Sequence, residues 1–265
     1  MESVIVLLIY LTACLTFDLI ACDSCWQINS RQMPYYKLIK PNARSNQLVL
    51  STATARNVNE CRIFATVKKA LAFNYGREMD YNERSIDIQS GSKITRKICQ
   101  ALQCPEIHNF TTIVEDRNFD YYSVYPSFIA AGSSFTLACV PKTGMFVFSN
   151  NRLNYSQART ACQKMNASLA HIISEERTNG LAKYIALTTP AFVGLSNRNH
   201  EKSWKNEFDE PLFCFNFRAW GKGQPTHSRG CVGLVQPAKS ESGPFWKVMP
   251  CNTILPFICE ISPIY

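Results

Sequence analysis

Apolar residues in the C-terminal half recur at helical spacing in two places. In the first, positions i, i+3, i+4 and i+7 share one face, formed by Ala158, Ala161, Cys162 and Met165. Asn154 or Ser156 can cap this helix, because either side chain offers an oxygen to the free N–H groups of the first turn. The second helix begins at Ser174, and the two acids that follow suit the helix dipole. Its expected buried face holds Leu181 and Ile185, with Ala182 and Tyr184 as further candidates.

After Pro190 the pattern changes to short apolar segments divided by polar turns. It predicts strands over residues 191–195, 231–235, 245–248 and 256–260. Two helices followed by short strands, with a long irregular stretch over 196–230, indicate an α+β fold. In the N-terminal half, residues 59–65 read as the start of a helix capped by Asn57 or Asn59, and residues 70–75 alternate as a strand does.

The long apolar run of the chain lies within its first 21 residues, at 4–17. It suits the core of a signal peptide and is short for a membrane span of roughly 20 residues. We expect a signal peptide over 1–21, cleaved after Ala21 or Ser24, and a secreted, extracellular protein without a membrane span. A signal anchor and a lipoprotein cleavage box ending at Cys22 are the alternatives.

Twelve cysteines in 265 residues fit an oxidising compartment, where disulfides persist. Cleavage after Ala21 would leave eleven, so that one thiol stays free or bridges two chains. Cleavage after Ser24 would leave ten, all of which could pair. Secretion would also make three sequons available for glycosylation, at Asn109, Asn154 and Asn166.

Composition and motifs exclude several classes. A hydrophobic content of 46% supports packed cores and excludes a wholly disordered chain. The net charge of +8 includes no dense basic run, so we expect no nucleic-acid partner. We find no zinc-ligand pattern, nucleophile elbow or phosphate-binding loop, and each cysteine is better assigned to a disulfide than to a nucleophile. We therefore expect no catalysis.

The C-terminal half resembles a C-type lectin-like domain over about 115 residues. The matching segments are ARTAC at 158–162, ASLA at 167–170, FVGL at 192–195, GQP at 223–225 and FICE at 257–260, together with Trp204, Trp220, Cys231, Trp246 and Cys251. The resemblance implies the disulfides Cys162–Cys259 and Cys231–Cys251. A bridge across so long a span should stabilise a small domain by a few kcal/mol.

In the sugar-binding members of that family, a Glu-Pro-Asn or Gln-Pro-Asp triplet, a later Glu and an Asn-Asp pair hold Ca²⁺. The corresponding positions here hold Gln224, Thr226, Arg229, Lys247 and Val248. Calcium needs about six to eight oxygen ligands. A cation at about 4 Å would instead cost roughly 4 kcal/mol at an effective dielectric near 20. We therefore expect a degenerate calcium site and no cofactor. A separate ion near Glu260 with Glu175 or Glu176 is weighed against ordinary surface acids, and we favour the latter.

The long loop of this half is basic and carries tryptophans. The candidate ligand-binding residues are Arg218, Trp220, Lys222, Gln224, Arg229 and Lys247. They would suit an anionic glycan or an acidic protein. In the alternative interpretation, Trp220 and Trp246 are core residues and the charges are solvated.

The N-terminal half resembles a PAN/apple domain over residues 25–104, because a cysteine-bearing helix precedes a strand that ends in AFNY at 72–75. By analogy we expect Cys25–Cys104 and Cys61–Cys99. In the C-type lectin-like half, Met145 stands where the family's optional N-terminal bridge has its second cysteine, so Cys139 needs another partner and Cys214 is the candidate. The expected organisation is a signal peptide at 1–21, a PAN/apple-like domain at 22–124, a linker at 125–138 and a C-type lectin-like domain at 139–265.

The expected function is that of a secreted, non-catalytic recognition or adhesion protein. Such tandems resemble secreted arthropod proteins of cuticle or apical extracellular matrix, so the partner would be an extracellular protein or glycan, including an anionic matrix polysaccharide. The alternative is a calcium-independent carbohydrate-binding lectin of innate immune recognition. A third option is a serum-type or venom-type protein that blocks another protein.

Overall fold

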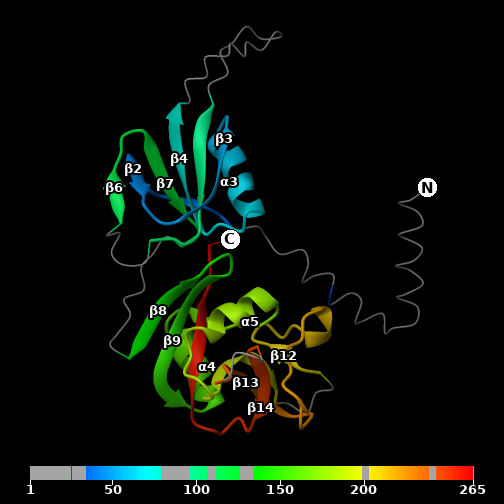
Figure 1. Cartoon of the computed structure of the whole chain (residues 1–265). Coiled ribbons are helices and arrows are strands. Elements are labelled where there is room, and N and C mark those ends of the chain that lie inside the picture. Colours follow the sequence, from blue (N-terminus) through cyan, green and yellow to red (C-terminus); the bar gives the residue numbers. More distant parts are fainter. Residues whose placement is uncertain are drawn as a thin grey trace, which may run out of the picture.

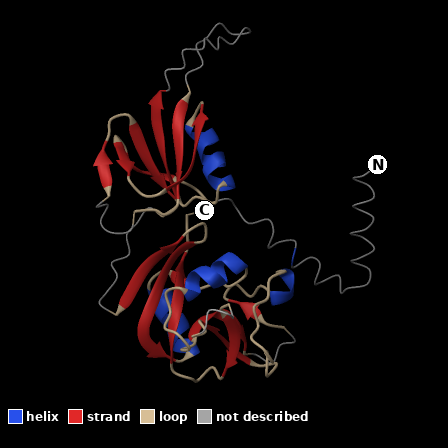
Figure 2. Cartoon of the chain, in the orientation of Figure 1, coloured by secondary structure: helices blue, strands red, loops and turns tan. Residues whose placement is uncertain are grey.

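The computed structural model describes residues 25, 34–78, 96–106, 112–125, 134–198, 203–238 and 243–264. Within them the chain forms two units, each with its own β-sheet (Figures 1 and 2). The expected signal peptide and the sequon at Asn109 lie outside the described residues. No helix in the described part of the chain is long and apolar enough to cross a membrane.

The first unit is a five-stranded sheet in the order β1-β7-β4-β5-β3. The strands are β1 (Lys37–Lys40), β3 (Val49–Ala55), β4 (Ala72–Glu78), β5 (Lys97–Leu102) and β7 (Phe119–Ser123). A separate two-stranded ribbon joins β2 (Ala43–Ser45) to β6 (Ile113–Glu115). One helix, α3 (Val58–Val67), packs against β3, β4 and β5. The assignment of this unit as PAN/apple-like stays a prediction.

Helix α3 forms where the sequence predicts one, and Asn57 is its cap. The Asn57 side chain accepts a hydrogen bond from the Glu60 N–H at 3.0 Å, and the Glu60 carboxylate accepts one from the Arg56 N–H at 2.9 Å. The first bond satisfies a donor that the helix start leaves open, and the second ties the residue before the cap to the first turn. Cys61 and Ala65 form the buried face of the helix.

The second unit is an eight-stranded sheet. Its main path is β14-β13-β11-β15-β9-β8, with β10 paired to β15 and β12 to β11. The strands are β8 (Phe135–Val140), β9 (Gly144–Leu153), β10 (Ala167–Leu169), β11 (Ala191–Asn197), β12 (Lys205–Asn206), β13 (Gly230–Val235), β14 (Phe245–Met249) and β15 (Leu255–Ile261). The helices are α4 (Tyr155–Lys164), α5 (Glu175–Ala182) and the short 3-10 turn η1 (Leu212–Cys214). The four strands predicted after Pro190 correspond to β11, β13, β14 and β15.

Strands β8 and β9 were not predicted. β9 is buried along its whole first half, from Gly144 to Ser149, because both of its faces are covered: Phe146 and Phe148 belong to one buried cluster and Val147 to another. A strand in that position shows no alternation of apolar and polar residues. β8 begins at Phe135, so this sheet starts inside the stretch that we expected to be a linker.

Both helices of the second unit begin at a side-chain cap. Asn154 caps α4 in a reciprocal arrangement with Gln157, and Ser174 caps α5. Leu181 and Ala182 are buried as expected. Tyr184 differs, because it follows the helix and is 45% exposed. Its ring stacks on Phe148 at 4.9 Å and its hydroxyl donates to the Cys139 carbonyl at 3.3 Å.

Five disulfides pair the ten cysteines from Cys25 onward. Cys162–Cys259, Cys231–Cys251 and Cys61–Cys99 are the pairs that the resemblances implied. The expected Cys25–Cys104 and Cys139–Cys214 pairs are wrong. Cys25 pairs with Cys214, and Cys104 pairs with Cys139. The analogy kept the bridges of Cys25 and Cys139 within one unit each, whereas both bridges link residues from different halves of the chain.

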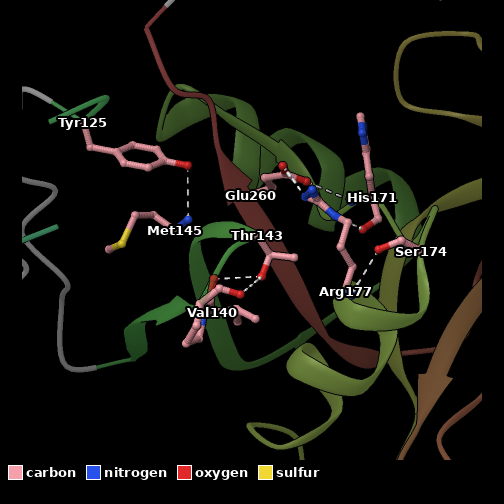
Figure 3. A network of polar contacts seen from close by, with 9 residues as sticks. Tyr125, Val140, Thr143, Met145, His171, Ser174, Arg177 and Glu260 are labelled. Carbon is pink, nitrogen blue, oxygen red and sulfur yellow. Dashed lines mark hydrogen bonds and ion pairs between the residues drawn. The ribbon is translucent and has the colours of Figure 1, made fainter. Parts of the chain in front are cut away.

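The two units meet through one buried cluster. It contains Tyr36 and Phe73 of the first unit together with Cys139 and Met145 of the second. The Met145 N–H donates to the Tyr125 hydroxyl at 3.3 Å (Figure 3). The end of the chain lies between the two sheets (Figure 1), where the Ile264 backbone accepts from Tyr35 N–H at 2.8 Å and donates to the Val124 carbonyl at 3.0 Å.

Candidate functional site

Two of the residues expected at a degenerate calcium site, Gln224 and Val248, meet between the long loop and β14, whereas Arg229 donates to the Arg198 carbonyl at 3.2 Å. The Gln224 side-chain oxygen accepts a hydrogen bond from the Val248 N–H at 2.9 Å. That oxygen therefore fastens the loop to the strand. Val248 itself is buried and apolar, whereas Thr226, Arg229 and Lys247 are exposed.

This set of side chains does not fit a calcium ion. Calcium binding needs carboxylate or carbonyl oxygens directed at one point. Here Gln224 already accepts an N–H, and two of the remaining positions carry positive charge. Among the described residues no group of three or more His, Cys, Asp or Glu side chains could hold a metal ion.

Arg218 serves the backbone of its own loop. Its guanidinium donates to the carbonyls of Leu212, Phe215 and Phe217 at 2.7, 2.5 and 2.6 Å. Burial lowers the pKa of Arg218 below its ordinary value. Because three carbonyls hold this guanidinium, it closes the turn after η1.

The tryptophans form an aromatic cluster. Trp246 is completely buried, and its ring centroid lies 5.4 Å from that of Trp220, which in turn lies 5.3 Å from that of Trp204. The Trp246 N–H donates to the Thr178 hydroxyl on α5 at 3.4 Å. The packing therefore supports the core interpretation of Trp220 and Trp246. Of the candidate ligand-binding residues, Lys222, Arg229 and Lys247 remain exposed cations.

Glu260 belongs to a network that the sequence alone did not predict (Figure 3). Its carboxylate forms an ion pair with Arg177 and accepts the His171 N–H at 3.1 Å. The Arg177 Nε donates to the His171 carbonyl at 3.0 Å. Burial alone would raise the pKa of Glu260, but Arg177 and His171 outweigh it and hold this pKa below its ordinary value.

This network bears on the alternative of a separate ion at Glu260. A guanidinium supplies the positive charge that an ion would bring. Glu176 instead faces the first unit and pairs with Lys69 at 3.8 Å. In the sequence, only Arg177 could have indicated this network. It stands two residues after Glu175 and was not among the predicted site residues.

Comparison with known proteins places one segment in a family. Residues 151–261 match the model of the lectin C-type domain. CD209 antigen-like protein D of Mus musculus is 30% identical over 115 residues, which are 43% of this chain and 46% of that protein. The CD209 antigen of Papio hamadryas is 31% identical over 118 residues, 44% of this chain and 32% of that one. This chain thus spans less than half the length of these relatives.

Two solved structures are similar at low identity. The C-type lectin domain of murine dendritic cell inhibitory receptor 2, in complex with an N-glycan, is 19% identical with a TM-score of 0.41, over 50% of this chain and 99% of that one. The mouse scavenger receptor C-type lectin carbohydrate-recognition domain is 22% identical with a TM-score of 0.40, over 51% and 100%. C-type lectin domains are generally non-catalytic, carbohydrate-binding modules, and those with disulfides are typically extracellular or lumenal. Residues 151–261 of this chain are a C-type lectin domain with homologues in the CD209 family.

Proposed function

We propose that the chain is a secreted, non-catalytic recognition or adhesion protein of extracellular matrix or cuticle that binds its partner without calcium. One observation carries the calcium-independent part. The Gln224 oxygen at the expected calcium position is bonded to the Val248 N–H, and the set contains Arg229 in place of the Glu and Lys247 in place of the Asn. A site of this charge repels a divalent ion.

The exposed cations of the long loop suggest the chemistry of the partner. Lys222, Arg229 and Lys247 are solvated, and none of them is required by the aromatic cluster. Exposed cations attract acidic surfaces, and salt at about 0.1 M screens that attraction beyond about 10 Å. We therefore propose an anionic glycan, such as a matrix polysaccharide, or an acidic extracellular protein.

The alternative is a calcium-independent lectin of innate immune recognition. The homology of residues 151–261 to CD209 antigens is as consistent with this role as with a role in the matrix. The two roles differ in what the secreted protein retains. A matrix protein would be recovered from extracted tissue matrix, whereas an immune lectin would bind soluble microbial or host glycans.

A glycan array probed in millimolar calcium chloride and again in EDTA tests the proposal. We expect the same glycans to be bound in both, and binding to weaken as salt is raised. The variant Lys247→Gln should bind acidic glycans more weakly and leave the melting temperature unchanged. Binding that disappears in EDTA would refute the proposed mode of recognition.

A further inference from the structure

A second polar region borders the candidate ligand-binding residues at Arg229, whose Nε donates to the Arg198 carbonyl at 3.2 Å. It is a cavity of about 260 Å³ between α4, the end of β11 and the β12 turn, lined only by polar and charged side chains. None of the six candidate ligand-binding residues lines it. Its charged members are Arg159, Arg198, Lys205, Glu207 and Asp209.

The Glu207 carboxylate holds one wall of this cavity in place. The Arg159 Nε donates to one of its oxygens at 2.7 Å, and the Tyr155 hydroxyl donates to the other at 3.0 Å. The Glu207 side chain is only 5% exposed. Its negative charge is therefore balanced by Arg159 and is screened from a ligand by the groups that bind it.

Arg198 is held by the same tyrosine. Its guanidinium carbon lies 5.2 Å from the centroid of the Tyr155 ring, within the range of a cation–π contact. Tyr155 is fully buried and meets Phe192 edge-on at 5.3 Å, so its ring is a fixed support. The Tyr155 hydroxyl is protonated at neutral pH and donates to Glu207, and burial raises its pKa further.

The lining of the cavity carries a net positive charge. It holds three cations, Arg159, Arg198 and Lys205, and two acids, Glu207 and Asp209. Asp209 is exposed and opposes the cations with one negative charge. Two anchored guanidinium groups at one cavity are suited to oxyanions, because their planar forks match the spacing of carboxylate or sulfate oxygens and little side-chain freedom is lost on binding.

We propose that this cavity binds the oxyanion group of a single acidic sugar, a carboxylate or a sulfate, through Arg159 and Arg198. The inference rests on the proposed function and names the site and the class of its glycan. The volume lies below the roughly 300–1,000 Å³ of most ligand pockets, so one sugar fits better than an oligosaccharide. Ser196 and Ser203 line the same cavity and offer hydroxyls to the sugar ring.

NMR titration of the secreted full-length chain tests this proposal. The probes are glucuronate as the carboxylate source, glucose 6-sulfate as the sulfate source, and glucose as the uncharged control. We expect at least one anion to shift the resonances of β11 and β12 saturably, while glucose does not. Saturation by only one of the two anions identifies which source the site accepts.

Three variants locate the binding. Arg198→Gln should lower the affinity for the anion about tenfold or more, because a charged hydrogen bond is lost. Lys37→Gln removes the same charge from the exposed face of β1, outside both sets of binding residues, and should leave this affinity unchanged. Asp209→Asn should tighten binding several-fold, and a gain of affinity cannot arise from misfolding.

The opposite results separate this inference from the proposed function. If Lys247→Gln lowers the affinity for the anion and Arg198→Gln does not, the cavity is the wrong site, although calcium-independent glycan binding stands. If neither anion shifts any resonance of β11 or β12, the inference is overturned. Loss of array binding in EDTA would instead refute the proposed function, whereas the NMR titration would still test anion binding in the cavity.

Discussion

At the scale of single residues, the Glu260–Arg177 pair is the contact with the largest expected effect on folding. Both side chains are largely buried, 16% and 13% exposed. Glu260→Gln keeps the shape and removes the charge, so the guanidinium would lose its counter-charge. We expect a loss of about 3 kcal/mol in unfolding free energy, measured by urea denaturation. Glu176→Gln, at the exposed pair with Lys69, is the control and should change the midpoint far less.

The same pair predicts a dependence on pH. The pKa of Glu260 is lower in the folded state than its ordinary value of about 4.3. A carboxyl group of this kind stabilises the fold above its unfolded pKa, and the contribution is lost as the pH falls through the folded pKa. The difference between wild type and Glu260→Gln should be full at neutral pH and shrink below about pH 4. A difference that persists undiminished in acid would show that the charge is not its source.

At the scale of elements, the start of α4 combines a helix cap with a sequon. The Asn154 side-chain oxygen accepts the Gln157 N–H at 2.9 Å. Asn154→Ala should cost about 1 kcal/mol, because the cap is lost. Asn154→Ser removes the sequon but keeps a good cap, so its stability in unglycosylated protein should match wild type. Denaturation curves of the three proteins measure this, and equal losses in both variants would contradict the role of the cap.

The sequon itself is tested by mass. We propose that Asn154 and Asn166 carry N-glycans in the secreted protein. Asn166 is exposed at the end of α4, with a φ of 52°. Ser156→Ala keeps the cap and removes only the sequon at Asn154, so the secreted chain should lose the mass of one glycan. An unchanged mass would show that Asn154 is not modified.

The elements that the sequence predicted well are those with a period of their own. Helix α4 forms where its apolar face and its cap predict it, and β11 and β13 form where short apolar runs lie between turns. β9 lacks such a period because its first half is buried on both faces. For the candidate site, the identities of Gln224 and Lys247 were enough to argue against calcium. The bond from Val248 to Gln224 required the tertiary structure, because 24 residues separate them.

At the scale of the whole molecule, the pattern of bridges departs from a simple tandem of domains. The Cys104–Cys139 disulfide links the strand β5 side of the first unit to β8 of the second. The sequence predicted Cys214 as the partner of Cys139, because nothing in the spacing of cysteines shows which units are in contact. The buried cluster that holds Tyr36, Phe73 and Met145 is continuous across the same junction. A shared core of this kind couples the folding of the parts that build it.

We therefore predict that the two units unfold together. Calorimetry should give one transition whose calorimetric and van't Hoff enthalpies agree. Tyr125→Phe removes the hydroxyl that accepts the Met145 N–H and should lower the stability of both units by about 1 kcal/mol. Hydrogen exchange of β4 and β11 amides would measure each unit separately. A loss confined to one strand, or two transitions in the wild type, would show that the junction does not couple them.

Removal of the Cys104–Cys139 disulfide tests the same coupling with a larger change in stability. The bridge spans 35 residues, so the double variant Cys104→Ser, Cys139→Ser should lose about 3–4 kcal/mol through the added entropy of the unfolded chain. If the buried cluster alone couples the units, this variant still melts in one transition at a lower temperature. The pair Cys231→Ser, Cys251→Ser is the control, because its bridge lies within the second unit and spans 20 residues. A split into two transitions only in the first variant would assign the coupling to the covalent bridge and not to the shared core.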